Sequence, residues 1–81
     1  MDQAFDNVEH TLQKAGGKGW EQVYKLTVYV DPVDPKAVER LIYNLRKYCP
    51  NHQPLVSLFG VAALGLPGMH VEIVVEAHLG Q

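Results

Sequence analysis

Apolar residues recur along this chain with two different periods, and each period predicts a different kind of element. Spacings of three and four residues over residues 3–15 predict an amphipathic helix, with Asp2 placed to cap its start and Gly16-Gly17 placed to stop it. The same spacings predict a second helix from Pro35 to about Tyr48. The side chains expected to face inward from the two helices are Ala4, Phe5, Val8, Leu12, Ala15, Val38, Leu41, Ile42 and Leu45.

Alternation with a period of two predicts strands elsewhere. Residues 22–30 are rich in β-branched and aromatic side chains, and one face of this strand is expected to be Tyr24, Leu26, Val28 and Val30. Residues 55–64 are nearly all apolar, so this run is expected to be central or buried on both faces. The last run covers residues 68–79 and has one wholly apolar face. Its other face carries His70, Glu72, Val74, Glu76 and His78.

The predicted order is helix, strand, helix, strand, strand over residues 1–81, which we interpret as one domain of the α+β class. Two helices packed on one face of a small mixed sheet are the simplest arrangement for this order. The other face would then carry Lys25, Thr27, Tyr29 and the ionisable side of the last strand. Such an uncovered face, together with open sheet edges, favours symmetric self-association.

Composition excludes several classes of function. The net charge is −2, and the 7 Lys and Arg residues are not gathered into a stripe, which argues against a nucleic-acid partner. No apolar run is long enough to span a membrane. Cys49 is the only cysteine, so no disulfide forms within the chain. A single thiol and no signal peptide lead us to expect a cytoplasmic protein.

The histidines of the last strand raise the question of a metal site. His70 and Glu72 are near neighbours on one face, but His78 lies eight residues from His70, which is beyond the reach of one metal ion. No metal site is therefore expected within one chain.

Several motifs carry a family resemblance. Residues 23–30, VYKLTVYV, are similar to a V-x-K-x-T-V-Y/F-V/L strand, and residues 7–17 to a helix that ends in A-G. Residues 60–64, 67–68 and 71–77 are similar to a C-terminal signature of the form V-A-x-L, P-G, V-E-I-E and A. In this order, and over nearly the whole chain, these motifs resemble the Rid family of reactive intermediate deaminases, also called YjgF-like or L-PSP endoribonuclease-like proteins.

The resemblance implies a chorismate-mutase-like α+β domain that forms homotrimers with ligand clefts between subunits. It also implies hydrolysis, without a cofactor, of reactive imines and enamines made by pyridoxal-phosphate enzymes, with release of ammonia. Glu72 matches the family glutamate that helps to place the attacking water, so it is the expected catalytic residue. The residues expected to contact a small-molecule substrate are Arg40, Tyr43, Ser57 and Leu58.

This chain departs from the family pattern in places that bear on activity. The match begins at the family's first helix, so the N-terminal hairpin and following strand have no counterpart here. The arginine that holds the substrate carboxylate falls at Val56, and valine cannot form a bidentate contact with a carboxylate. Arg40 aligns with a family asparagine, and it is either a replacement for that arginine or an exposed helix residue.

Two hypotheses follow from this comparison. The chain is either a deaminase of small imines or enamines in which Glu72 positions water, or a catalytically silent Rid-like module for binding and assembly. A structural role for Glu72 at a subunit contact fits the second hypothesis. Ribonuclease activity, which one family name suggests, is disfavoured by the acidic net charge.

Overall fold

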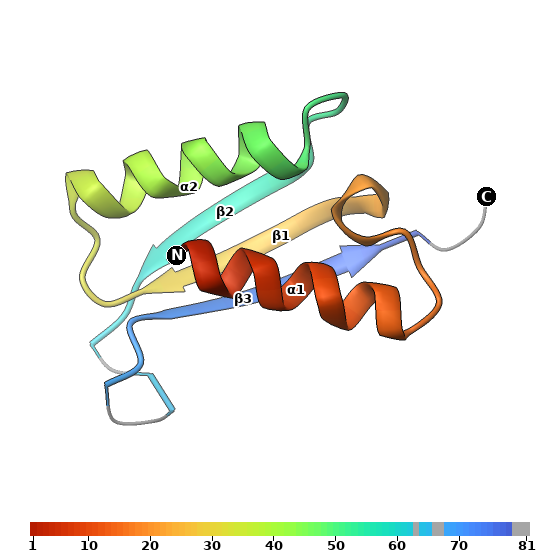
Figure 1. Cartoon of the computed structure of the whole chain (residues 1–81). Helices are drawn as coiled ribbons and strands as arrows, with labels where there is room; N and C mark the ends of the chain where they lie inside the picture. Colours follow the sequence, from red (N-terminus) through yellow and green to blue (C-terminus); the bar gives the residue numbers. More distant parts are fainter. Residues whose placement is uncertain (63, 66–67, 79–81) are drawn as a thin grey trace.

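The computed structural model, which describes residues 1–62, 64–65 and 68–78, has a layer of helices on a sheet (Figure 1). The predicted element order is confirmed, with a short 3-10 helix added before the first strand. The elements are α1 (Asp2–Lys14), η1 (Gly19–Gln22), β1 (Val23–Val30), α2 (Pro35–Tyr48), β2 (Leu55–Gly60) and β3 (Val71–Ala77).

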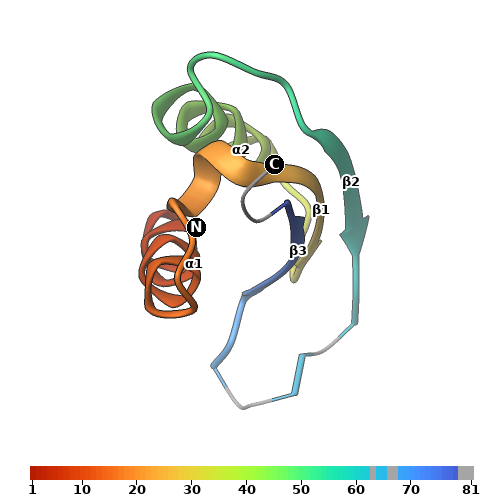
Figure 2. The same ribbon diagram turned by 90° about the vertical axis from the view of Figure 1, so that its right-hand side faces the viewer.

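The sheet has the strand order β2-β1-β3, so β1 is its central strand. β1 pairs in parallel with β2 and antiparallel with β3, which gives the mixed sheet that was predicted. The parallel pair is joined by α2, as a parallel connection requires. Both helices lie on one side of the sheet and leave its other side open (Figure 2). The α+β arrangement expected from the sequence is therefore confirmed.

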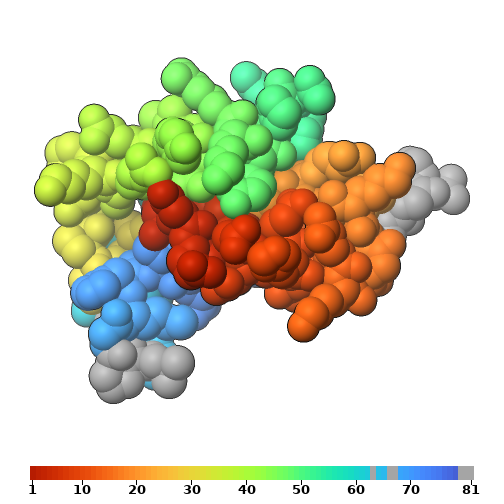
Figure 3. Space-filling view, in the orientation of Figure 1, coloured from red at the N-terminus to blue at the C-terminus, as the bar shows by residue number. Residues whose placement is uncertain are grey.

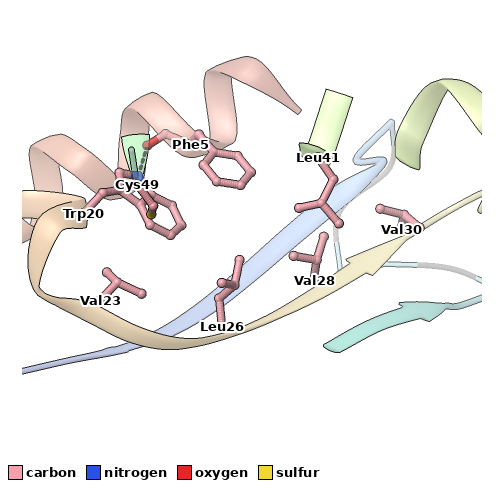
Figure 4. Packing of buried hydrophobic residues seen from close by; sticks show 8 residues of the cluster. All are labelled: Phe5, Trp20, Val23, Leu26, Val28, Val30, Leu41 and Cys49. Atoms are coloured by element: carbon pink, nitrogen blue, oxygen red, sulfur yellow. Dashed lines mark hydrogen bonds between the residues drawn. The ribbon is translucent and has the colours of Figure 1, made fainter. Parts of the chain in front are cut away.

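The core lies between the helices and β1 (Figure 4). Phe5 of α1 and Trp20 of η1 stack with ring centroids 4.6 Å apart, and both are essentially inaccessible to solvent. The indole Nε1–H of Trp20 donates a 2.8 Å hydrogen bond to the backbone carbonyl of Phe5. Backbone N–H of Trp20 also donates to the Glu9 carboxylate at 2.9 Å. Together these contacts attach α1 to the segment that leads into the central strand.

A β-bulge changes which side chains of β1 face the core. The pairing of β1 with β3 shifts its register between Val23 and Lys25. Because the bulge inserts one residue, Val23 faces the core and Tyr24 is 50% exposed. The expectation that Tyr24 faces inward is wrong for this reason, whereas Leu26, Val28 and Val30 are buried as predicted.

The apolar run that begins at residue 55 is neither central nor buried. β2 is an edge strand that ends at Gly60, and Leu55 and Phe59 are 71% and 52% exposed. The prediction of a central or doubly buried strand is therefore wrong within one chain. Among the described residues, β2 is paired along one edge, with β1, and no helix covers the side of β2 that faces away from the helix layer (Figure 2).

The last strand is shorter than predicted. β3 begins at Val71 rather than at residue 68, where Gly68 has the left-handed φ of +79° that suits a turn. His70 lies outside the strand, and its carbonyl accepts a 3.0 Å hydrogen bond from the backbone N–H of Asp31. Leu79, which was expected to extend the strand, lies outside the described residues.

α2 presents a different side to the core than its apolar pattern predicts. Leu41 and Asn44 are buried, whereas Val38 and Ile42 are 37% and 44% exposed. The side-chain amide of Asn44 donates 2.8 Å hydrogen bonds to the Asp2 carboxylate and to a carbonyl of its own helix. This buried polar contact turns Asn44 inward, and the expected inward positions of Val38 and Ile42 are wrong.

The helix ends follow the predicted chemistry in part. Asp34 accepts a 2.8 Å hydrogen bond from the backbone N–H of Ala37 and so caps α2. Gly16 takes a left-handed φ of +93° after α1, as predicted. Asp2 makes no capping bond and instead lies in the first turn of α1, where its carboxylate faces Arg40 of α2.

Replacement of Trp20 tests the attachment of α1. Trp20→Ala is expected to lower the free energy of unfolding by about 3–5 kcal/mol, because it leaves a cavity at the stacked rings. Trp20→Phe removes the indole N–H that donates to the carbonyl of Phe5 together with part of the buried ring system, which should cost about 1–3 kcal/mol. Urea unfolding followed by circular dichroism gives both values. Tyr24→Phe, at an exposed position, is the control and should change the free energy of unfolding by about 0.5 kcal/mol or less. If Trp20→Phe lost no more stability than Tyr24→Phe, the proposed role of the indole N–H would be contradicted.

The contact of Asp2 with Arg40 predicts a pH dependence of stability. Hydrogen bonds from Arg40 and Asn44 lower the pKa of Asp2 from 3.8 to about 2. Because this folded pKa lies below the unfolded one, the stabilisation is present above pH 3.8 and is lost as the pH falls through about 2. Melting temperatures should therefore fall more steeply over this range in the wild type than in Asp2→Asn. Asp6→Asn, on the same helix, is the control and should keep the wild-type slope.

Candidate functional site

The open face of the sheet is formed by alternate residues of its strands. In β1 these residues are Lys25, Thr27 and Tyr29, each paired with one residue on either side. Their neighbours on the same face are Leu55, Ser57 and Phe59 of β2, and Glu72, Val74 and Glu76 of β3. Because both helices lie on the opposite side, side chains of this face are available to solvent or to a partner (Figure 2).

Glu72 lies on this open face. It is directly opposite Tyr29 across the antiparallel pair, and Tyr29 stacks on Phe59 of β2 with centroids 5.9 Å apart. Glu72 is exposed, and among the described residues no side-chain hydrogen bond or ion pair engages its carboxylate. The carboxylate is therefore free to contact water or a ligand beside an aromatic pair.

Glu76, the second acid of the same face, is in a different situation. Its carboxylate is 3.7 Å from the ammonium nitrogen of Lys25 and accepts a 3.1 Å hydrogen bond from the hydroxyl of Tyr24. Donation to this carboxylate raises the pKa of Tyr24. Lys25 thus pairs with an acid across the strands, so Glu72 is the unpaired acid of the described open face.

The N-terminal end of α1 lies against α2 (Figure 3). Arg40 belongs to α2 and reaches Asp2 in the first turn of α1. Its guanidinium donates to both oxygens of Asp2, one of them at 3.0 Å, and stands 4.1 Å from the ring centroid of Tyr43. This bidentate pair raises the pKa of Arg40 and lowers that of Asp2. Arg40 therefore ties the two helices together and is not aimed at the open face.

A cleft of about 750 Å³ lies between the C-terminal end of α2, the following loop and β2. Val56, where the family resemblance led us to expect a carboxylate-binding arginine, forms part of its wall. Arg46 of α2 also lines this cleft. Arg46 was not predicted as a site residue, since only the folding of α2 over the edge strand brings it beside Val56.

His52 and Cys49 also line this cleft, and contacts within the protein limit the reactions that each can support. His52 makes a 2.8 Å hydrogen bond from Nε2 to the carbonyl of Val23, so Nε2 carries the proton and Nδ1 is the acceptor of the neutral ring. Burial raises the pKa of the Cys49 thiol to about 11. Cys49 is therefore a neutral packing residue near neutral pH and not an activated nucleophile.

The residues predicted to form the site do not converge within one chain. Glu72 and Ser57 share the open face but belong to strands separated by β1. Leu58 pairs with Val28 and packs against the core on the helix-covered face. Arg40 and Tyr43 are exposed on α2, in the helix layer. Only residues from more than one copy could bring all of them together.

The described residues do not assemble a metal site or a membrane span. No group of three or more His, Cys, Asp or Glu among them could hold a metal ion. The ring of His70 is held by a 3.1 Å hydrogen bond from Nδ1 to the carbonyl of Asp31. Among the helices described, none is long and apolar enough to cross a bilayer.

Solved structures of other proteins share this architecture. A protein of unknown function of the conserved Rid family from Yersinia pestis is 28% identical, with a TM-score of 0.83 over 96% of this chain and 59% of its own. A member of the YjgF/YER057c/UK114 family from Mycobacterium tuberculosis is 26% identical, with a TM-score of 0.76 over 91% of this chain and 60% of its own. This chain thus spans about three-fifths of the length of these relatives.

The family comparison extends over nearly the whole sequence. The model of the family described as Endoribonuclease L-PSP matches residues 1–79, whereas no functionally curated protein matches the chain. The structural matches confirm the YjgF-like α+β fold that the motifs implied. The chain therefore belongs to the Rid family, also called the YjgF or L-PSP endoribonuclease-like family.

Proposed function

We propose that this chain is the subunit of a deaminase that hydrolyses small reactive imines or enamines at a cleft between copies. The observation that carries this proposal is the unpaired, exposed carboxylate of Glu72 beside Tyr29 on the open sheet face. Family membership supports the reaction class, because the motif around Glu72 resembles the one that places water in Rid proteins.

The chemistry needs one base and one water. Glu72 accepts a proton from water as the water oxygen attacks the imine carbon, which forms a carbinolamine. The proton held by Glu72 passes to the nitrogen, and the proton of the carbinolamine hydroxyl follows by way of the same carboxylate. The carbon–nitrogen bond then breaks, and a carbonyl compound and ammonia leave. Backbone N–H groups of residues 57–60 are suited to hold the polar end of the substrate. No step of this sequence requires a cofactor.

Assembly is part of the proposal, because the site residues lie on different layers of one chain. The open face exposes Leu55, Phe59 and Val74 at 71%, 52% and 50%. Apolar side chains grouped on one face favour association, and a symmetric homotrimer would set the open face of one copy against the α2–β2 side of the next. Glu72 would then meet residues of a neighbouring copy.

A catalytically silent binding and assembly module remains the second candidate. Two observations favour it: Val56 stands where the family's carboxylate-binding arginine was expected, and Arg40 is already paired with Asp2. In this alternative Glu72 contributes to a subunit contact, and the oligomer forms without turnover.

Substitution of Glu72 separates the two candidates. Ammonia release from an enamine generated in situ should fall by about 10²- to 10⁴-fold in Glu72→Gln, because the base that activates water is lost. Glu76→Gln is the matched control, since it changes an acid of the same strand and face that is already paired with Lys25. Equal background rates in the wild type and Glu72→Gln would rule out the deaminase and leave the silent module.

The mass in solution tests the proposed assembly. Light scattering should give the mass of three chains for the wild type. Val74→Asp places a charge in the middle row of the open face, beside Thr27, and should shift the mass to that of one chain. Thr11→Asp places the same charge on an exposed position of α1, outside both proposed contact surfaces, and should leave the oligomer intact. A wild type that is monomeric, or a mass that Val74→Asp does not change, would refute assembly through this face.

A further inference from the structure

One side of α2 gathers positive charge that is scattered along the sequence. α2 holds four of the 7 Lys and Arg residues of the chain but only one of its 9 acidic residues, Glu39. Residues 36, 40, 43 and 47 are four, three and four positions apart, so they form one row along the helix. The basic row consists of Lys36, Arg40, Tyr43 and Lys47. The sequence was expected to lack a cationic stripe, and the formation of α2 creates one.

The basic row is accessible and borders an open groove. All four of its side chains are exposed. The groove has a volume of about 760 Å³ and is lined by Glu39, Arg40, Ile42, Tyr43, Arg46 and Lys47. Leu45, which lines the cleft beside β2, is about half a turn around the helix axis from Lys36. The basic row therefore faces away from that cleft and from the proposed contact between copies.

Three cations of this surface keep their charge available. Among the described residues, no carboxylate lies within ion-pair distance of Lys36, Arg46 or Lys47. Lys47 stands 5.2 Å from the ring centroid of Tyr48, a contact that does not neutralise its charge. The helix dipole favours cations in the last turn, which accounts in part for Arg46 and Lys47. The same dipole disfavours a cation in the first turn, so Lys36 is better explained by a partner outside the helix.

The surface combines these cations with exposed apolar groups, which narrows the class of partner. Ile42 and Tyr43 are 44% and 49% exposed and line the groove together with Arg46 and Lys47. Nucleic acids bind mainly through many phosphate contacts, and three unpaired cations on a chain of net charge −2 offer few. A membrane surface binds helices with a broad apolar face, whereas only two side chains of this groove are apolar. An acidic segment with apolar side chains between its carboxylates matches both features.

We propose that this side of α2 docks an acidic helical segment of a partner protein. Lys36, Arg46 and Lys47 contact its carboxylates, while Ile42 and Tyr43 receive its apolar side chains. Members of the basic row recur every three or four residues, which is also the spacing of side chains on one face of a partner helix. The row spans about 16 Å, so about three turns of such a helix cover it.

Two peptides of matched shape test the docking surface. The probe is a fluorescein-labelled helical peptide of about fourteen Glu, Ala and Leu residues, with Leu along one face and Glu on either side. Its control has Gln in place of every Glu, which removes the charge and keeps the shape. Fluorescence anisotropy should show binding of the Glu peptide to the wild type and at least about 10-fold weaker binding of the Gln peptide. Added sodium chloride should weaken binding of the Glu peptide, because the contacts are exposed and ionic.

Paired substitutions locate the binding surface. Lys36→Gln combined with Lys47→Gln should weaken binding of the Glu peptide by about 3- to 30-fold, as expected for two exposed ion pairs. Lys14→Gln combined with Lys18→Gln is the matched control, because it removes the same charge from α1 and the loop after it and should leave the affinity unchanged. Tyr43→Ala should also weaken binding, since it removes an apolar contact in the groove. Circular dichroism checks that these exposed substitutions leave the fold intact.

Each outcome decides the proposal. Equal affinity for the two peptides, or an equal loss in the two double variants, would overturn it. Vesicles of phosphatidylserine and poly(U) RNA are the competing anionic partners. Tighter binding of either one, if it depended on Lys36 and Lys47, would assign the surface to a membrane or to a nucleic acid instead. If Lys36→Gln with Lys47→Gln failed to fold, the two peptides on the wild type would still decide.

The docking goes beyond the proposed reaction and does not depend on it. Glu72 lies on the open face of the sheet, whereas α2 lies on the other side (Figure 2). The variant with Lys36→Gln and Lys47→Gln should therefore release ammonia at the wild-type rate. Peptide binding without any ammonia release from imines would keep the docking surface and refute the deaminase.

Discussion

Burial of one face of β1 under two helices is the interaction on which the rest of the structure depends. Val23, Leu26, Val28 and Val30 are at most 1% exposed, and burying each such side chain contributes about 1.5–3 kcal/mol. Both α1 and α2 pack on this face of the sheet, so neither covers the opposite face. The positions of Glu72 and of the Tyr29–Phe59 stack on the uncovered face follow from this one-sided cover.

Much of the architecture could be predicted because periodicity reports the side of an element on which a residue lies. Periodicity cannot report which element packs against that side. The wrong predictions for the burial of β2 and for the inward side of α2 both arise from this limit. A continuous apolar run has the same pattern whether it is central or at an edge that awaits a partner. The burial of Asn44 depends on Asp2, 42 residues earlier in the chain, and the bulge at Tyr24 leaves no periodic signal.

The same limit applies to the candidate site, where some residues could be placed from the sequence and others could not. Alternation along the last strand was enough to place Glu72 on a face without cover, opposite the apolar row of Ile73 and Val75. Arg40 could not be assigned from sequence, since its partner Asp2 is 38 residues away and on another helix. Arg46 was missed because the cleft beside Val56 exists only after α2, the loop and β2 pack together.

Trp20 is the single tryptophan of the chain, and its surroundings give it a spectroscopic consequence. The indole is almost inaccessible to solvent and stacks on Phe5. Its ring centroid lies 6.1 Å from that of Tyr48 at the end of α2. Cys49, the next residue, belongs to the same buried cluster and also lines the cleft that contains Arg46. The fluorescence of one native indole therefore reports, without any label, on the junction where α1, the end of α2 and the cleft meet.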